Sequence, residues 1–276
     1  MTTGFVEVAD RVHVLRDPLL QVNVTLVVGD GAALLVDTLS TAGQARELAE
    51  AARAVTPHPW TVVNTHHHFD HCFGNATLAA DPPRPVYAHE RALVVLRDRP
   101  DALRRAAYEE MRAEQPALAA ELADTELLAP TDGVLIETVL DIGGRRVLLR
   151  HPGHGHTDAD LVVHVPDADV LVAGDLVEQS GPPAFEESYP LQWPDAVADL
   201  LRLTTPATVV VPGHGEPVDA EFVREQHAQL ARQAWLIRAG HTGSAPPERV
   251  AAESPFGARP GLIAARRGYA ELDGTA

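Results

Sequence analysis

Lysine is absent from this 276-residue chain, because all 22 of its basic residues are arginine. They face 39 acidic residues, for a formal net charge of −17. Such an excess of negative charge repels phosphate backbones and anionic lipid surfaces. Nucleic acids and membranes are therefore not expected as partners.

Cysteine is nearly absent as well, since Cys72 is the only one, and no intramolecular disulfide can form. The first residues lack the charged and apolar regions of a secretory signal peptide. No run of 18 apolar residues exists, so no transmembrane helix is expected. Together these absences favour a cytoplasmic protein that is held together by an apolar core.

What the chain does have is a regular alternation of strand-like and helix-like segments. Its length fits one large domain, and 45% hydrophobic residues are enough for a sizeable core. β-Branched apolar runs predict strands, and stretches with one apolar face at helical spacing predict helices. We expect strands within residues 5–37, 61–65, 86–89, 134–150, 161–175 and 208–214, and helices at 40–55, 194–203 and 219–238.

Two segments stand outside this alternation. Residues 90–127 are rich in Ala, Leu, Arg and Glu, which predicts a helical insertion broken near Pro100 and Pro116. Residues from about 240 to 276 are punctuated by Gly and Pro and are expected to extend over the surface. The whole chain, residues 1–276, is therefore expected to be a single α/β domain whose sheets carry helices on their outer faces.

The densest polar cluster is the stretch THHHFDHCFGN, residues 65–75, directly after the apolar run TVVN. On an extended segment, side chains at i and i+2 point the same way, so His66 and His68 are placed to bind one metal ion. Asp70 and His71 follow, where a turn would aim both at a second ion. Imidazole together with carboxylate suits zinc, and also manganese or iron.

Three further polar loops end apolar runs later in the chain. HPGHGHTDAD contains His151, His154 and His156, VLVAGDL contains Asp175, and VVVPGHGE contains His214. Four such loops, each at the C-terminal end of an apolar run, favour a shared functional site over unrelated surface histidines.

The order and spacing of these motifs resemble the metallo-β-lactamase-fold hydrolase superfamily. The motifs are His-x-His-x-Asp-His at 66–71, Gly-His-Thr at 155–157, Gly-Asp at 174–175 and Pro-Gly-His-Gly at 212–215. The resemblance implies an αβ/βα four-layer sandwich of two mixed β-sheets with outer helices and the site at one edge. It implies one ion on His66, His68 and His156, a second on Asp70, His71 and His214, and a bridge between them at Asp175.

Such a ligand set implies a hydrolase with two divalent ions, zinc first and manganese or iron as alternatives. Two ions about 3.5–4 Å apart share a bridging water and lower its pKa towards about 7, which supplies hydroxide at neutral pH. Asp70 is expected to be the catalytic residue that orients this hydroxide and carries its proton. The expected reaction is cleavage of an ester, thioester or lactone bond in a small-molecule substrate.

Asp175 at the bridging position resembles the glyoxalase II-like thioesterases and the lactonases. The zinc-cysteine β-lactamases have Cys there, and many place Lys three residues later to bind the drug's carboxylate, where this chain has Glu178. β-Lactam hydrolysis is therefore expected only as a minor activity. A mononuclear iron enzyme of the persulfide dioxygenase type and a non-catalytic binding protein are the alternatives from other functional classes.

The other residues of the motifs are expected to lie outside the metal centre. His67, His89, His151 and His154 are expected as packing, loop or hydrogen-bonding residues, and Cys72 as a buried small residue.

The loop at 178–193 is expected to form one wall of the substrate pocket. Its aromatic residues, Phe185, Tyr189 and Trp193, offer an apolar surface, and its glutamates disfavour an anionic substrate. A neutral or cationic substrate with an apolar part is expected. The helical segment 90–127 is expected to supply a second wall or the face of a homodimer.

Overall fold

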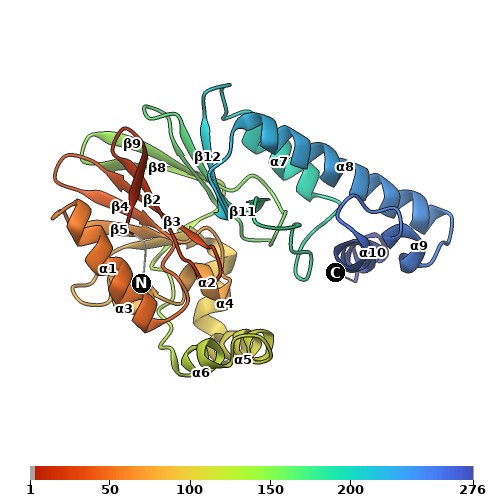
Figure 1. Ribbon diagram of the computed structural model, residues 1–276, viewed down its shortest axis with the longest axis horizontal. Helices are drawn as coiled ribbons and strands as arrows, with labels where there is room; N and C mark the ends of the chain where they lie inside the picture. The colour runs from red at the N-terminus through yellow and green to blue at the C-terminus, as the bar shows by residue number, and fades with distance from the viewer. Residues whose placement is uncertain (1–3, 276) are drawn as a thin grey trace.

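The computed structural model describes residues 4–275, and its centre is a pair of β-sheets that face each other (Figure 1). Helices cover the outer side of each sheet, so the layers follow the order helix, sheet, sheet, helix. One group of buried apolar side chains lies between the sheets, and two others lie between each sheet and its helices. The α/β four-layer sandwich predicted from the sequence is thereby confirmed.

The N-terminal half of the chain builds a sheet of seven strands in sequence order. The first four strands pair antiparallel, and the pairings from β4 to β7 are parallel, so the sheet is mixed. Because parallel strands end at the same edge, the loops after β4, β5 and β6 emerge side by side. The strands are β1 (Val6–Ala9), β2 (Val12–Arg16), β3 (Asn23–Val28), β4 (Ala33–Val36), β5 (Trp60–Val63), β6 (Val86–His89) and β7 (Asp132–Val134).

The second sheet has five strands in the order β12-β11-β10-β9-β8. Only β11 and β12 pair in parallel, and both carry site residues near their C-terminal ends. Every residue of β11 is buried, which explains why VLVAGDLVE has no polar alternation before its acidic residues. The strands are β8 (Glu137–Ile142), β9 (Arg145–Arg150), β10 (Val162–Val165), β11 (Val170–Glu178) and β12 (Val209–His214).

The outer helices cover the sheets with apolar faces. Thr41 caps α1 (Ala42–Val55) by accepting a hydrogen bond from the Gln44 amide, and Leu48 is buried towards the first sheet. On the other side, α7 (Trp193–Leu201) and α8 (Ala220–Thr242) bury Trp193 and Leu230 against the second sheet. Two short helices, α2 (Phe69–Cys72) and α3 (Asn75–Ala79), follow β5 within the histidine-rich segment.

Three helices fill the segment 90–127, where a helical insertion was expected. They are α4 (Glu90–Asp98), α5 (Pro100–Met111) and α6 (Pro116–Asp124). Pro100 and Pro116 each begin a helix, the position where proline's missing N–H is tolerated. Figure 1 shows α5 and α6 as a pair that extends away from the sheets below α2 and α4.

The structure differs from the sequence expectation in two places. The apolar run at 134–142 is not one strand, because β7 joins the first sheet and β8 begins the second. The C-terminal segment forms α9 (Pro247–Ala251) and α10 (Ala258–Asp273) rather than an irregular surface extension. Small residues let α10 pack closely, since a Cβ at Gly268 would lie 2.6 Å from the Ile237 side chain. The description as a single domain, and the expectation of a homodimer, stay predictions.

None of the helices in the described part of the chain is long and apolar enough to cross a membrane.

Candidate metal centre

The histidine-rich segment leaves the C-terminal end of β5 and is fixed there by buried amides. Asn64, the residue after the strand, donates to the backbone oxygen of His71 at 3.2 Å and to the side chain of Asn75 at 3.0 Å. The Cys72 thiol, which is buried as expected, lies 3.2 Å from the backbone oxygen of His68. These contacts fold the segment back on itself, so that alternate side chains face the edge where the two sheets meet.

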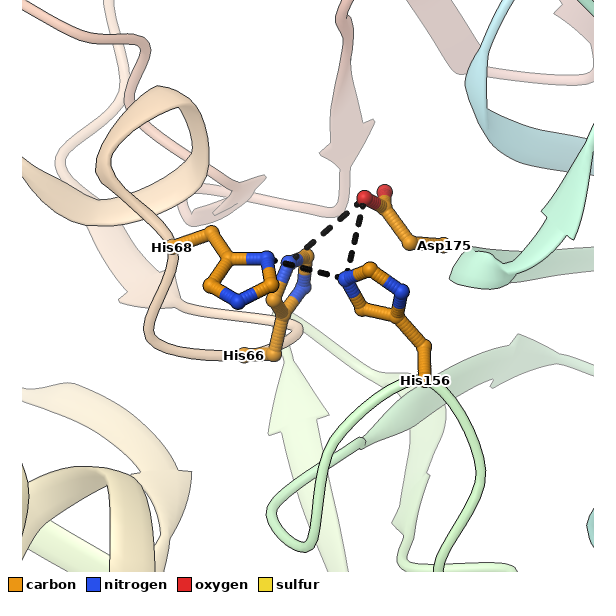
Figure 2. Close-up of side chains that lie close together, drawn as sticks. All are labelled: His66, His68, His156 and Asp175. Carbon is orange, nitrogen blue, oxygen red and sulfur yellow. Dashed lines mark hydrogen bonds and ion pairs between the residues drawn. The ribbon is translucent and has the colours of Figure 1, made fainter. Parts of the chain in front are cut away.

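The first group of donor atoms consists of three imidazoles and one carboxylate (Figure 2). Nδ1 of His68 lies 2.9 Å from Nε2 of His156, and Nε2 of His156 lies 3.4 Å from Oδ2 of Asp175. Nε2 of His66 lies 3.6 Å from the same carboxylate oxygen. Donors bound tetrahedrally to one ion at about 2.0–2.1 Å lie at similar separations, so this group fits a zinc-sized ion.

The second group shares Asp175 with the first. Nε2 of His71 lies 3.1 Å from Asp175 Oδ1, and Nε2 of His214 lies 3.5 Å from Asp175 Oδ2. Asp70 completes it, with Oδ2 at 3.4 Å from Nε2 of His214. A Cβ at Gly213 would lie 1.8 Å from Asp175 Oδ1, so glycine is required for the bridging carboxylate to occupy this place.

Unpaired buried atoms indicate that these groups are built for cations. Nε2 of His66, Nε2 of His71 and Oδ1 of Asp175 are buried and make no well-aligned hydrogen bond, although the last two atoms lie 3.1 Å apart. Leaving such atoms unsatisfied is costly, and a divalent ion would satisfy all three. All seven residues predicted as ligands, His66, His68, Asp70, His71, His156, Asp175 and His214, thus lie together, and their donor set fits two divalent metal ions.

The outer nitrogens of the histidines are held by neighbours that set their orientation. Nδ1 of His214 lies 2.9 Å from the backbone oxygen of Leu20, and Nδ1 of His71 lies 2.8 Å from Oδ2 of Asp37. Asp37 also accepts hydrogen bonds from the amide and the hydroxyl of Thr65, at 2.7 and 2.8 Å.

Asp37 was not predicted as a site residue, although a signal was present. It ends the apolar run AALLV just after β4, as Asp175 ends another run near the C-terminal end of β11. Its backbone has a φ of +68°, a conformation that aspartate tolerates better than most residues. The buried Asp37 carboxylate therefore contacts a metal ligand, His71, and does not belong to the donor set itself.

Electrostatics divide the ligands into two kinds. Burial lowers the pKa of His66 far below its usual value and that of His156 to about 3, so both are neutral imidazoles. For His214, burial opposes protonation, but the carboxylates of Asp175, Glu178 and Asp70 together outweigh it and raise the pKa to about 10. The pKa of His71 is raised in the same way, because the carboxylates around it outweigh its burial.

The remaining histidines of the motifs lie outside these two donor groups, although His67 forms another possible metal-holding group with His68 and Glu187. His67 and His68 both direct Nε2 towards Oε2 of Glu187, at 3.4 and 3.5 Å, and these hydrogen bonds lower the pKa of Glu187. His89 and His151 stack on each other with ring centroids 4.2 Å apart. His154 packs its ring against Tyr189, with centroids 4.7 Å apart, consistent with the expected packing roles.

A cleft of about 590 Å³ opens over the donor groups. One wall is α5, which supplies Leu103 and Met111, so the expectation that segment 90–127 lines the pocket is met. The other wall is the loop after β11. The expectation that this loop presents its aromatic side chains to the cleft is wrong. Phe185 and Trp193 are 1% and 0% exposed and pack in the core beneath the loop, because their rings fill the space between α7 and the second sheet.

The cleft itself is acidic. Among the residues that the structure describes, the lining of the cleft includes one arginine, Arg259, and five glutamates, which are Glu110, Glu114, Glu178, Glu186 and Glu187.

A four-layer sandwich with histidines and aspartates gathered at the strand ends defines an α/β protein built around a metal centre. The model of the Metallo-beta-lactamase superfamily matches residues 17–214, which is more than half of the chain. The chain belongs to this superfamily, as its motifs predicted.

Comparisons with individual proteins agree. A metallo-beta-lactamase type 2 of Bacillus cereus is 29% identical over 161 residues, 57% of this chain and 52% of the relative. The Xenopus laevis metallo-beta-lactamase domain-containing protein 1 is 38% identical over 87 residues, 29% of this chain and 34% of that protein. The chain thus spans about half the length of the Bacillus relative.

Solved structures share the fold. The metallo-beta-lactamase from Pontibacter korlensis gives a TM-score of 0.65 at 20% identity, covering 82% of this chain and 98% of that one. The enzyme FIM-1 from Pseudomonas aeruginosa, in its mono-zinc form, gives 0.64 at 20% identity, covering 85% and 96%.

Proposed function

We propose that this protein is a metal-dependent hydrolase that holds two divalent ions, zinc being the first choice, and cleaves an ester, thioester or lactone. The observation that carries the proposal is the pair of donor groups that share one carboxylate, Asp175, at the floor of a cleft. A carboxylate shared by two donor triads can hold two ions close together, as two-ion hydrolysis requires. The bridging residue is aspartate rather than cysteine, which supports the glyoxalase II-like and lactonase-like branch.

The chain's own residues have separable roles in this proposal. Two bound divalent ions would polarise the scissile carbonyl and lower the pKa of a water molecule between them. Asp70 is 8% exposed and lines the cleft, so its carboxylate is placed to take a proton from the attacking water and pass it on. Asp37 holds His71 in orientation, and the burial of His66 and His156 keeps both imidazoles neutral and able to bind metal.

The walls of the cleft favour a neutral or cationic substrate with an apolar part. Leu103 and Met111 on α5, together with Phe69 beside the centre, offer apolar surface. The glutamates of the lining repel a carboxylate-bearing substrate, and Glu178 stands where many β-lactamases place a lysine. β-Lactam hydrolysis, which the names of several relatives raise, is for this reason proposed only as a minor activity.

The test is to assay wild-type protein and the variant Asp70→Asn against neutral and cationic esters, thioesters, lactones and a carboxylate-bearing β-lactam. Loss of the general base should lower the hydrolysis rate by about 10²–10⁴-fold while the protein stays folded. Asp158→Asn is the control, because Asp158 pairs with Arg91 outside the cleft lining. Unchanged hydrolysis by D70N, or a preference for the β-lactam over every ester, would contradict the proposal.

A further inference from the structure

The geometry points to Glu178 as an additional ligand of the second metal ion, and we propose that role here. This proposal rests on the two-ion function proposed above. The register of the parallel pair β11 and β12 places Glu178 directly opposite His214, a member of the second donor group. A carboxylate oxygen of Glu178 lies within 4.8 Å of the donor atoms of both His214 and Asp175.

Glu178 is a buried glutamate whose side chain lines the cleft. Its exposed fraction is 8%, and among the described residues no hydrogen bond or ion pair reaches its side-chain oxygens. Burying an unpaired carboxylate is expensive, and here the cost rises further because Asp175 is a like charge close by. A bound cation would offset this cost and keep the side chain a carboxylate, whereas without one the group would be neutralised by a proton.

Beyond the imidazoles of the second donor group, the protein offers little that could serve as that cation. The sequence has no lysine, and the one arginine in the described lining of the cleft is Arg259 on α10. Two divalent ions carry four positive charges, of which Asp70 and Asp175 neutralise two. Glu178 supplies a third negative charge next to the second donor group, where positive charge remains.

The backbone at this position is held rigidly, which favours a metal ligand over a mobile substrate contact. The amide of Glu178 donates to Oε1 of the buried Gln226 at 3.0 Å, and Gln226 in turn donates to the backbone oxygen of Leu176 at 2.8 Å. The amide of the next residue, Gln179, donates to the backbone oxygen of His214 at 3.1 Å. Glu178 and His214 are thus fixed to each other as neighbouring ligands would be.

The consequence concerns the choice of metal. The first group has three imidazoles and shares Asp175, whereas the second would have two imidazoles, Asp70, Glu178 and the shared Asp175. Carboxylate oxygens suit manganese better than imidazole nitrogens do, and a fifth donor exceeds the tetrahedral coordination usual for structural zinc. The second position should therefore accept Mn²⁺ more readily than the first.

The experiment titrates chelator-treated protein with ZnCl2 and with MnCl2 by calorimetry, and measures metal content after dialysis. Wild type is compared with Glu178→Gln, Glu178→Asp and the matched control Glu110→Gln, which removes a glutamate of the same cleft on α5. We expect E178Q to bind the first ion normally and the second about 10–100-fold more weakly, with the larger loss for Mn²⁺. E178D should recover part of the affinity for the second ion, and E110Q should bind both ions with the affinity of the wild type.

Three results would overturn the proposal. Equal second-ion affinity in E178Q and E110Q would show that Glu178 does not bind metal. A higher KM for a cationic ester with unchanged metal affinity would assign Glu178 to the substrate instead. Fewer than two ions in the wild type would refute the two-ion function as well, which separates that failure from the other two. The unfolding temperatures of the variants exclude loss of the fold as the cause.

Discussion

Two groups of histidines lie in this protein, and they are arranged in opposite ways. In the metal centre, imidazole nitrogens and carboxylate oxygens converge, with donor separations such as 2.9 and 3.1 Å. In a second group, which we call the outer histidines, His89, His151 and His154 stack ring against ring, with Tyr189 closing the row. Among the described residues, the possible metal-holding groups contain none of the outer histidines.

The difference lies in what the surroundings supply to each imidazole. The metal centre places carboxylates beside its histidines, as Asp175 beside His71 and His214. Around the outer histidines, burial dominates and lowers the pKa of each, to about 4 for His89. Convergence of nitrogens on carboxylates, rather than the number of histidines in a loop, therefore distinguishes a metal site from packing.

The largest effect is expected from two substitutions in the same loop. His156→Gln removes a donor of the first group, whereas His154→Gln, two residues earlier, removes only a ring that packs on Tyr189. H156Q should weaken binding of the first ion by more than about 100-fold and abolish hydrolysis. Loss of a residue that only hydrogen-bonds to a metal ligand already costs up to about 100-fold in affinity, and His156 is a ligand itself. H154Q should keep both ions.

Metal analysis and ester hydrolysis on the two purified variants make this comparison. Equal metal content in H154Q and H156Q would remove the distinction between the two groups.

A smaller effect is expected at Asp37, which supports the metal centre without belonging to its donors. Asp37→Asn keeps the size of the side chain but removes the charge that faces Nδ1 of His71. Affinity for the second ion should fall about 10–100-fold, measured by zinc titration. Asp169→Asn is the control, because Asp169 accepts hydrogen bonds from Thr205 and Thr208 outside the centre. If D37N and D169N bind zinc alike, Asp37 does not orient the ligand.

The smallest effect concerns stability and pH. The pKa of His89 is about 4 in the folded protein because of burial, against about 6.5 when unfolded. The unfolded state therefore binds more protons below about pH 6.5, so stability is full above that value and is lost as the pH falls towards 4. Between about pH 7.5 and 5, wild type should lose about 2 kcal/mol more of its unfolding free energy than His89→Gln.

Urea unfolding of both proteins at the two pH values measures this difference. Parallel pH dependences would mean that His89 is not held neutral by its packing.

Much of the metal centre could be predicted from the sequence because its residues end apolar strands. His66, Asp175 and His214 each follow or close such a run, and the C-terminal ends of parallel strands meet at one edge. Asp37 carried the same signal but stood in a stretch without histidines. The loop from 178 to 193 was harder, since its pattern does not reveal that Phe185 and Trp193 turn inwards while Glu186 and Glu187 face the cleft.

The fold was predictable for a similar reason, and its exceptions are physical. Alternation and helical spacing predict individual elements, but not the sheet to which a strand belongs, so the division between β7 and β8 was not visible. The small residues of α10 look like loop punctuation in the sequence, yet they allow close helix packing, with Ala264 and Ala265 fully buried. Contacts between distant segments decide such cases.

The most direct test of the two-ion centre is the metal content per chain of protein purified without added metal, measured by mass spectrometry. We expect about two ions per chain, chiefly zinc, lost on chelation and regained on titration. A single iron ion would favour a mononuclear enzyme of the dioxygenase type. No metal at all, with none regained when zinc, manganese or iron is supplied, would contradict the metal centre and favour a non-catalytic binding protein.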